Sequence, residues 1–389
     1  FIASGTGMGA DAAKHLSSKG YDIAIMSSSG KGEELAKKLD GFGFTGSNLS
    51  SKDIDNFLNQ TLSKFGKIDV LVCNAATNPF MGSMLDMPSD KFDKVMENNI
   101  KSKRPFNWGI ATSSYQIEGG HDLHGRGPSV WDVFSHSKGR VKNGDNGDIA
   151  CDHYHLFPED IKLMKDLGVD SYRFSISWPR IFPVGTEDKI NQPGMDFYDR
   201  LVDTLLENNI TPFVTLNHWD IPQGLEDLGG WTNRDMVEQF IKYSHYLSRG
   251  LGDRVSNWIT HNEPWCISFL GYVEGRKPPG LKGEWAKSLH TAHHLLLSHG
   301  KAVPEIKSNV KNAKVGITLN LNTAIPASDS EYDKKECAFY DAQFNRLYLD
   351  PLYKKKYPEL LFKRLLEKGS IKQSDLNFIK DGDLKTIST

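Results

Sequence analysis

Trp258-Ile259-Thr260-His261-Asn262-Glu263-Pro264-Trp265 is the stretch that decides the fold of this chain. The apolar run from 255 to 260 predicts a short strand buried on both faces, and Pro264, which has no backbone N–H, cannot continue it. Glu263 is therefore expected at the strand's carboxyl end, where barrels of parallel strands carry their reactive groups. The rings of Trp258 and Trp265 would partly desolvate its carboxyl group, which suits a general acid. A solvated loop glutamate is the alternative interpretation.

The composition is typical of a soluble globular protein. Of the 389 residues, 38% are hydrophobic, which is enough to build buried cores. The 47 basic and 49 acidic residues nearly cancel to a net charge of -2, so no nucleic-acid partner is predicted. No apolar run approaches the roughly 20 residues that cross a bilayer, so no membrane partner is predicted either. The oligomeric state stays open.

Four cysteines stand far apart, and their spacing predicts reduced thiols and a cytoplasmic protein: Cys73, Cys151, Cys266 and Cys337. A strand that is already under way at Phe1 indicates that the native amino terminus lies upstream. No metal site is predicted, because His290, His293 and His294 share one helix without an acid to complete a ligand set.

A strand, a glycine-rich turn and a helix open the chain at residues 1–20. Small residues at such a turn let backbone N–H groups approach a phosphate at the start of the helix, where the macrodipole also favours an anion. Strand and helix patterns then alternate, which predicts a parallel sheet. The expected strands are 21–26, 42–47 and 68–73, and the expected helices are 32–39, 52–65 and 90–101.

By these motifs, residues 1–102 resemble the front half of a short-chain dehydrogenase/reductase. The matching parts are Ser4-Gly5-Thr6-Gly7-Met8-Gly9, Cys73-Asn74-Ala75-Ala76 and Glu97-Asn98-Asn99-Ile100. The resemblance implies a partial Rossmann-like sheet that binds NAD or NADP, with the cofactor-binding residues Gly5, Gly7, Gly9 and Asn74. Ser27-Ser28-Ser29 offers no acid for a ribose 2′-hydroxyl, which favours NADP.

The catalytic pair of that family is missing from the segment. No tyrosine in the chain is followed four residues later by a lysine, so nothing would protonate a carbonyl during hydride transfer. The segment could at most bind a nucleotide. A half domain without function is the alternative.

The pattern changes at residues 101–105 without a linker, which predicts one domain over 1–104 and a second over 105–389. After the boundary, strands alternate with helices five times. The expected strands begin near Phe106 and continue at 171–175, 212–216, 255–260 and 315–319, with helices at 158–167, 193–207, 235–250 and 284–308. This order predicts a (β/α)₈ TIM barrel that is incomplete, with about five of the eight units.

Each predicted strand ends in polar and aromatic residues: Gln116, Arg173 with Trp178, Asn217-His218-Trp219-Asp220, Asn262-Glu263, and Asn320. Sugar hydroxyls need directional hydrogen-bond partners, and the C–H face of a pyranose packs on an aromatic ring. The strand ends therefore predict a sugar-binding site.

These residues lie in motifs that resemble glycoside hydrolase family 1, the β-glucosidase family, over residues 106–389. The motifs are residues 106–119, Ser129-Val-Trp-Asp-Val-Phe134, residues 171–181, Thr215-Leu-Asn-His-Trp-Asp-Ile-Pro222 and Thr260-His-Asn-Glu-Pro264. The resemblance implies retaining hydrolysis of β-glucosides or β-galactosides, without a cofactor. Glu263 would be the acid/base, Asn262 would hold the 2-hydroxyl, and Arg173 would pair with the nucleophile. Gln116 and His218 would bind the non-reducing sugar, with Trp219 beside them.

The nucleophile of that family is a second glutamate in a Thr-Glu-Asn-Gly motif, and this motif does not occur in the chain. A retaining mechanism needs a second carboxylate about 5 to 5.5 Å from the first. The sequence ends where a sixth strand would begin, so we expect the chain to be inactive or nearly so. Two other interpretations stay open: a nucleotide-binding fragment, and a non-catalytic fusion of two truncated genes.

Overall fold

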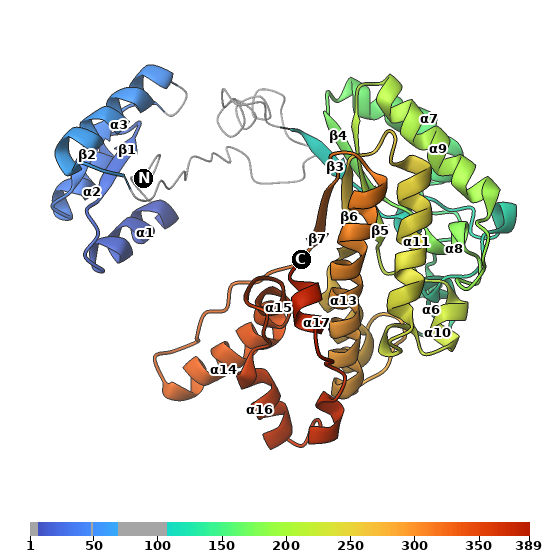
Figure 1. Cartoon of the computed structure of the whole chain (residues 1–389). Coiled ribbons are helices and arrows are strands. Elements are labelled where there is room, and N and C mark those ends of the chain that lie inside the picture. Colours follow the sequence, from blue (N-terminus) through green and yellow to red (C-terminus); the bar gives the residue numbers. More distant parts are fainter. Residues whose placement is uncertain (1–6, 48–49, 69–106) are drawn as a thin grey trace. The chain divides into compact units, whose positions relative to one another are not determined.

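The computed structural model describes residues 7–47, 50–68 and 107–389 (Figure 1). Internal contacts divide the chain into two compact units, residues 1–106 and 107–389. Each unit is described by itself.

The described part of the first unit alternates helices and strands in the predicted order. Its elements are α1 (Gly7–Ser17), β1 (Ala24–Ser27), α2 (Lys31–Lys38), β2 (Phe42–Thr45) and α3 (Ser51–Phe65). The strands β1 and β2 pair in parallel, with Ala24 opposite Phe42, so the parallel sheet that the sequence predicts is confirmed. The predicted strand 68–73 and helix 90–101 lie almost wholly outside the described residues.

The first unit buries small and branched side chains between its helices and strands. Ala13, Ile25 and Ala36 are fully buried and join α1 and α2 to β1. On the other side of the sheet, Phe57 of α3 packs against Met26. Strand β1 begins three residues later than expected, and Tyr21, which was predicted to open it, is 54% exposed.

The second unit is organised around five parallel strands, β3 (Gly109–Ala111), β4 (Ser171–Ser175), β5 (Thr211–Asn217), β6 (Asn257–Asn262) and β7 (Lys314–Thr318). Their order in the sheet is their order in the chain, and every neighbouring pair is parallel. Within this sheet β3 and β7 each have one neighbour only. The incomplete barrel predicted from the sequence is confirmed.

Four long helices follow the strands and cover the sheet: α7 (His153–Asp166), α9 (Gln192–Glu207), α11 (Met236–Leu251) and α13 (Trp285–Asn309) (Figure 1). Their apolar faces form a continuous core with the strands. Leu201, Phe240 and Leu295 are among its fully buried members. Shorter helices in the loops are α5 (Ser114–Ile117), α6 (Val130–His136), α8 (Trp178–Ile181), α10 (Gln223–Asp227) and α12 (Pro264–Phe269).

Residues after β7 form a second core on the other face of α13. The helices are α14 (Glu331–Asp341), α15 (Leu347–Lys354), α16 (Glu359–Glu367) and α17 (Asp383–Ile387). Leu296 of α13 packs with Tyr348, Leu361 and Ile387 in this core. His293 also lies here, between the Tyr357 hydroxyl at 2.9 Å and an Asp383 oxygen at 2.9 Å.

The histidines that the sequence singled out have structural partners. His294 shares a hydrogen bond with the Trp231 carbonyl, and His290 with the Asp375 carbonyl. Across residues 7–47, 50–68 and 107–389, no three metal-ligating side chains gather in one place. Cys151, Cys266 and Cys337 are free thiols. In the same ranges no helix combines the length and the apolar character that a membrane span requires.

Candidate active site

Glu263 directly follows the last residue of β6. The strand runs two residues later than the sequence predicts, because Val255 still donates its N–H to Leu251 at the end of the preceding helix. Glu263 is half-buried and has a left-handed backbone with φ 47°, and Pro264 then opens α12. Its N–H donates to the Thr318 carbonyl of β7 at 2.8 Å. The backbone of the candidate acid is thus held by the neighbouring strand.

Asn262 connects Glu263 to Arg173 of β4. Its Nδ2 donates to Glu263 Oε2 at 3.0 Å, and its Oδ1 accepts from an Arg173 N–H at 2.6 Å. Arg173 also donates through Nε to the buried Thr215 hydroxyl at 2.9 Å. Burial lowers the pKa of Arg173, and the carboxylate of Glu263 acts in the opposite direction. The guanidinium fixes the amide orientation, and the amide in turn holds the carboxylate.

The indole of Trp219 joins this polar row to a cavity. Its Nε1 donates to the Asn262 carbonyl at 2.7 Å, and its own backbone has φ 76°. The Asn217 side chain accepts a hydrogen bond from the Trp219 N–H at 3.2 Å and supports this turn. The ring centroid of His218 lies 4.9 Å from that of Trp219.

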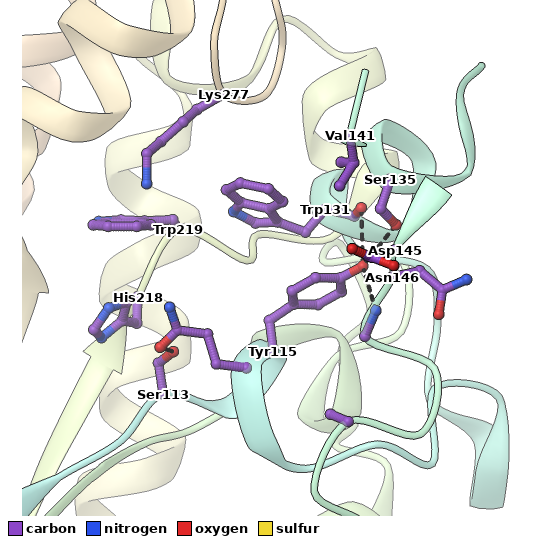
Figure 2. Close-up of a pocket in the computed structure, with 13 residues that line it drawn as sticks. Ser113, Tyr115, Trp131, Ser135, Val141, Asp145, Asn146, His218, Trp219 and Lys277 are labelled. Carbon is purple, nitrogen blue, oxygen red and sulfur yellow. Dashed lines mark hydrogen bonds between the residues drawn. The ribbon is translucent and has the colours of Figure 1, made fainter. Parts of the chain in front are cut away.

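The cavity has a volume of about 310 Å³ and is lined by residues from two of the predicted strand ends (Figure 2). Gln116, His218 and Trp219 all line it, so these three predicted sugar-binding residues lie together. Arg173, Asn262 and Glu263 are not among its lining residues and adjoin it through Trp219. The other lining residues are Ser113, Tyr115, Trp131, Ser135, Val141, Asp145, Asn146, Gly147, Ala150 and Lys277.

Two of the polar side chains that line the cavity, Gln116 and His218, can form hydrogen bonds to a ligand without carrying a charge. Gln116 is exposed, and its Oε1 accepts from the Ser113 hydroxyl at 2.7 Å, which leaves its amide N–H groups for a ligand. Burial, with Arg173 and Lys277 nearby, lowers the pKa of His218 to about 3. His218 is therefore neutral at physiological pH, and its buried Nδ1 has no hydrogen-bond partner among the described residues.

A buried ion pair positions the loop that carries Gln116. Glu118 lies two residues after Gln116 and accepts from Arg180 Nε at 3.1 Å and from the Tyr198 hydroxyl at 2.5 Å. The Arg180 guanidinium also lies 4.2 Å from the Tyr154 ring centroid. The same loop is tied to the segment after β5 by Ser114, whose hydroxyl donates to buried Asp220 at 2.5 Å.

Three residues of the site were not predicted from their strand positions. Tyr115 donates to the Trp131 carbonyl at 3.2 Å, so the two form one aromatic wall with ring centroids 5.7 Å apart. Trp131, which belongs to the predicted motif 129–134, lines the cavity as well. Cys266 has its thiol 3.7 Å from Glu263 Oε2. Lys277 comes from the loop before α13. In the sequence it is a lysine followed by two prolines, and this pattern does not indicate a binding residue.

The predicted cofactor-binding residues lie only partly within the described structure. Gly5 and Asn74 fall outside the described residues, whereas Gly7 and Gly9 begin helix α1. The Ser27 hydroxyl at the end of β1 accepts from the Gly32 N–H at 2.8 Å. Ser27, the first of the three serines whose lack of an acid favoured NADP, thus joins β1 to α2, and nucleotide binding stays a prediction.

The five parallel strands with polar groups at their carboxyl ends place residues 107–389 in the class of TIM-barrel proteins. A family model described as glycosyl hydrolase family 1 matches residues 99–389, and the chain belongs to that family. A second model, described as enoyl-(acyl carrier protein) reductase, matches residues 2–104.

Relatives and solved structures agree with this family. Beta-glucosidase A of Acetivibrio thermocellus is 49% identical over 291 residues, which are 75% of this chain and 63% of the relative. A 1,4-beta-D-glucan glucohydrolase of Thermotoga neapolitana is 50% identical over 66% of this chain and 60% of its own length. A family 1 beta-glucosidase from Thermotoga maritima, solved in complex with deoxynojirimycin, has a TM-score of 0.68 and 45% identity, and covers 74% of this chain and 63% of that one. The chain thus spans less than two thirds of the length of these relatives.

Proposed function

We propose that residues 107–389 bind β-linked glucosides or galactosides in the cavity beside Trp219, with Glu263 as the general acid of a β-glycosidase site. The observation that carries the proposal is the continuous row from Arg173 through Asn262 to Glu263, joined to the cavity by the Trp219 indole. The β-glucosidase relatives support the same assignment.

The chemistry of the site follows from the groups in that row. A general acid protonates the glycosidic oxygen as the bond to the anomeric carbon breaks. Asn262 would hold the 2-hydroxyl of the sugar while its Nδ2 keeps the Glu263 carboxyl in place. Gln116 and neutral His218 would bind further hydroxyls, and an indole face would support the ring.

We further propose that these 389 residues bind glycosides with little or no turnover. Retaining hydrolysis needs a second carboxylate at about 5 to 5.5 Å from the acid, to form the glycosyl-enzyme and release it. The family supplies it from a Thr-Glu-Asn-Gly motif that this sequence does not contain. Binding and hydrolysis must therefore be measured separately.

Calorimetric titration with cellobiose and with maltose tests the binding site directly, because the two glucose disaccharides differ in the anomeric configuration of the bond. We expect cellobiose to bind more tightly, and Gln116→Ala to weaken it. Gln192→Ala is the matched control, because Gln192 is exposed on α9, where its side chain donates a hydrogen bond to Asp196. Equal binding of both sugars, or unchanged binding in Gln116→Ala, would refute the proposed site.

Hydrolysis is measured with a nitrophenyl β-glucoside. We expect release of nitrophenol at the level of a protein-free control, and no further decrease in Glu263→Gln. Release well above that level that Glu263→Gln abolishes would refute the proposed loss of turnover while supporting the role of Glu263. Release well above the control level that Glu263→Gln leaves unchanged would reject Glu263 as the acid.

A further inference from the structure

Lys277 places a cation inside the cavity. Its side chain is half-buried, and its Nζ lies 3.7 Å from the ring centroid of Trp219 and 5.6 Å from that of Trp131 (Figure 2). Such cation–π contacts stabilise an ammonium but leave its three N–H donors without acceptors. Among the described residues, no hydrogen bond or ion pair engages this ammonium, in contrast to neighbouring Arg276, which pairs with Glu274.

The position of Lys277 relative to Trp219 indicates which part of a glycoside it would meet. Figure 2 shows Lys277 and His218 on opposite sides of the Trp219 ring. His218 belongs to the group that would bind the non-reducing sugar, so Lys277 faces a different part of the ligand. Lys277 also interacts electrostatically with Glu263, the group that would protonate the leaving oxygen. The ammonium therefore lies toward the leaving group, the aglycone.

The charges around the cavity determine the ligand chemistry that suits this ammonium. Of the described residues that line the cavity, Lys277 alone is positively charged, because the lowered pKa of His218 keeps that imidazole neutral. Asp145 is the acid in the lining, and it is exposed, so water screens its charge. One half-buried positive charge matches a singly charged carboxylate better than a phosphate with nearly two charges.

We propose that Lys277 selects β-glucosides whose aglycone carries a carboxylate, such as an aldonic or uronic acid. The inference rests on the proposed glycoside site and adds the class of aglycone. The carboxylate would accept hydrogen bonds from the ammonium in front of the Trp219 face, and the indoles would cover the remaining apolar surface of the ligand.

Calorimetric titration of the full chain with cellobionate and cellobiitol tests this selection. Both are glucose β-1,4-linked to an open-chain aglycone of the same length, and they differ only in a terminal carboxylate or alcohol. We expect cellobionate to bind about tenfold more tightly at low salt, the size of effect that a single charge-assisted hydrogen bond produces. Lys277→Met keeps the apolar stem and should remove the difference. Arg276→Met removes an adjacent exposed cation and should preserve it.

The outcomes separate this inference from the glycoside assignment. If the unaltered chain binds cellobiose and binds cellobionate and cellobiitol equally well, the role of Lys277 is overturned and the proposed glycoside site is retained. A tenfold preference that survives in Lys277→Met also overturns it. Failure of all three sugars to bind overturns both. Because a variant can lose its fold, salt provides a second measurement on the unaltered chain: higher ionic strength should weaken cellobionate binding and leave cellobiitol binding unchanged.

Discussion

Replacing Glu118 by alanine should destabilise the second unit strongly, because it would leave a buried guanidinium without its counter-ion. The side chain of Arg180 is 1% exposed and that of Glu118 is 6% exposed, so water cannot replace the lost carboxylate. Burial opposes the charge of Arg180, yet its pKa is raised overall, with Glu118 the largest favourable contributor. Glu118→Ala would remove that support and the acceptor of the Tyr198 hydroxyl together.

The expected magnitude follows from the pair being buried. Removing one partner of a buried ion pair costs about 3–5 kcal/mol, and the unpaired Tyr198 hydroxyl adds roughly 1 kcal/mol. For a unit of this size, such a loss lowers Tm by roughly 10 °C. Arg254→Met is the control, because Arg254 forms its ion pairs with Asp199 and Asp203 at the surface, where each pair contributes less than about 1 kcal/mol.

The assay is urea denaturation followed by circular dichroism, supported by thermal melting. A loss below about 1 kcal/mol in Glu118→Ala would refute the assignment of a critical buried ion pair. Replacing both partners, as Glu118→Gln with Arg180→Met, should recover part of the lost stability, because neither side chain then carries a buried charge. A double variant less stable than Glu118→Ala alone would contradict this account.

Three further predictions concern acid stability, the site and the first unit. Burial lowers the pKa of His218 to about 3 and the pKa values of His294 and His299 to about 4, so below pH 6.5 these histidines bind more protons in the unfolded chain than in the folded one. The urea concentration at the unfolding midpoint should therefore fall as the pH is lowered from 6.5 to 4, and a midpoint that stays constant over this range would contradict the burial of these histidines. Asn262→Ala removes an acceptor from Arg173 and a donor to Glu263, so cellobiose should bind about tenfold more weakly by calorimetry, whereas exposed Gln192→Ala should leave affinity unchanged. If residues 1–104 bind a nucleotide, NADPH fluorescence should change on mixing and Gly7→Val should abolish the change; no change at millimolar NADPH would end that interpretation.

The strand ends could be predicted from the sequence because parallel strands bring their carboxyl ends to one edge. Arg173 and Asn262 are 89 residues apart in the chain and still form a hydrogen bond, as the strand order requires. The predicted strand at 171–175 coincides with β4, whose five residues are all buried or half-buried. At β6 the apolar run includes Val255, whose N–H still donates to the Leu251 carbonyl at the end of the preceding helix. The predicted strand therefore began two residues too early.

The remaining features of the site depend on packing that no local pattern encodes. Lys277 enters the cavity because its loop folds over Trp219 and Trp131, which lie on segments distant in sequence. In the sequence, Glu118 stands near the end of the motif at residues 106–119, and nothing there indicates that it is buried. Its burial is seen only in the structure, where Arg180 and Tyr198 donate hydrogen bonds to its carboxylate. Charged residues are usually exposed, so a sequence reading assigns both to the surface by default.

The hydrogen bond from the Glu263 N–H to the Thr318 carbonyl makes the position of the carboxyl group dependent on its neighbouring strand. Within the sheet, β7 forms hydrogen bonds to one neighbouring strand, β6. Its alignment therefore depends on these hydrogen bonds and on the helices packed behind it. A polypeptide that extended the sheet beyond β7 would therefore change the aim of Glu263 without contacting its side chain. The position of the proton-donating carboxyl group thus depends on a backbone carbonyl that lies more than fifty residues away in the chain.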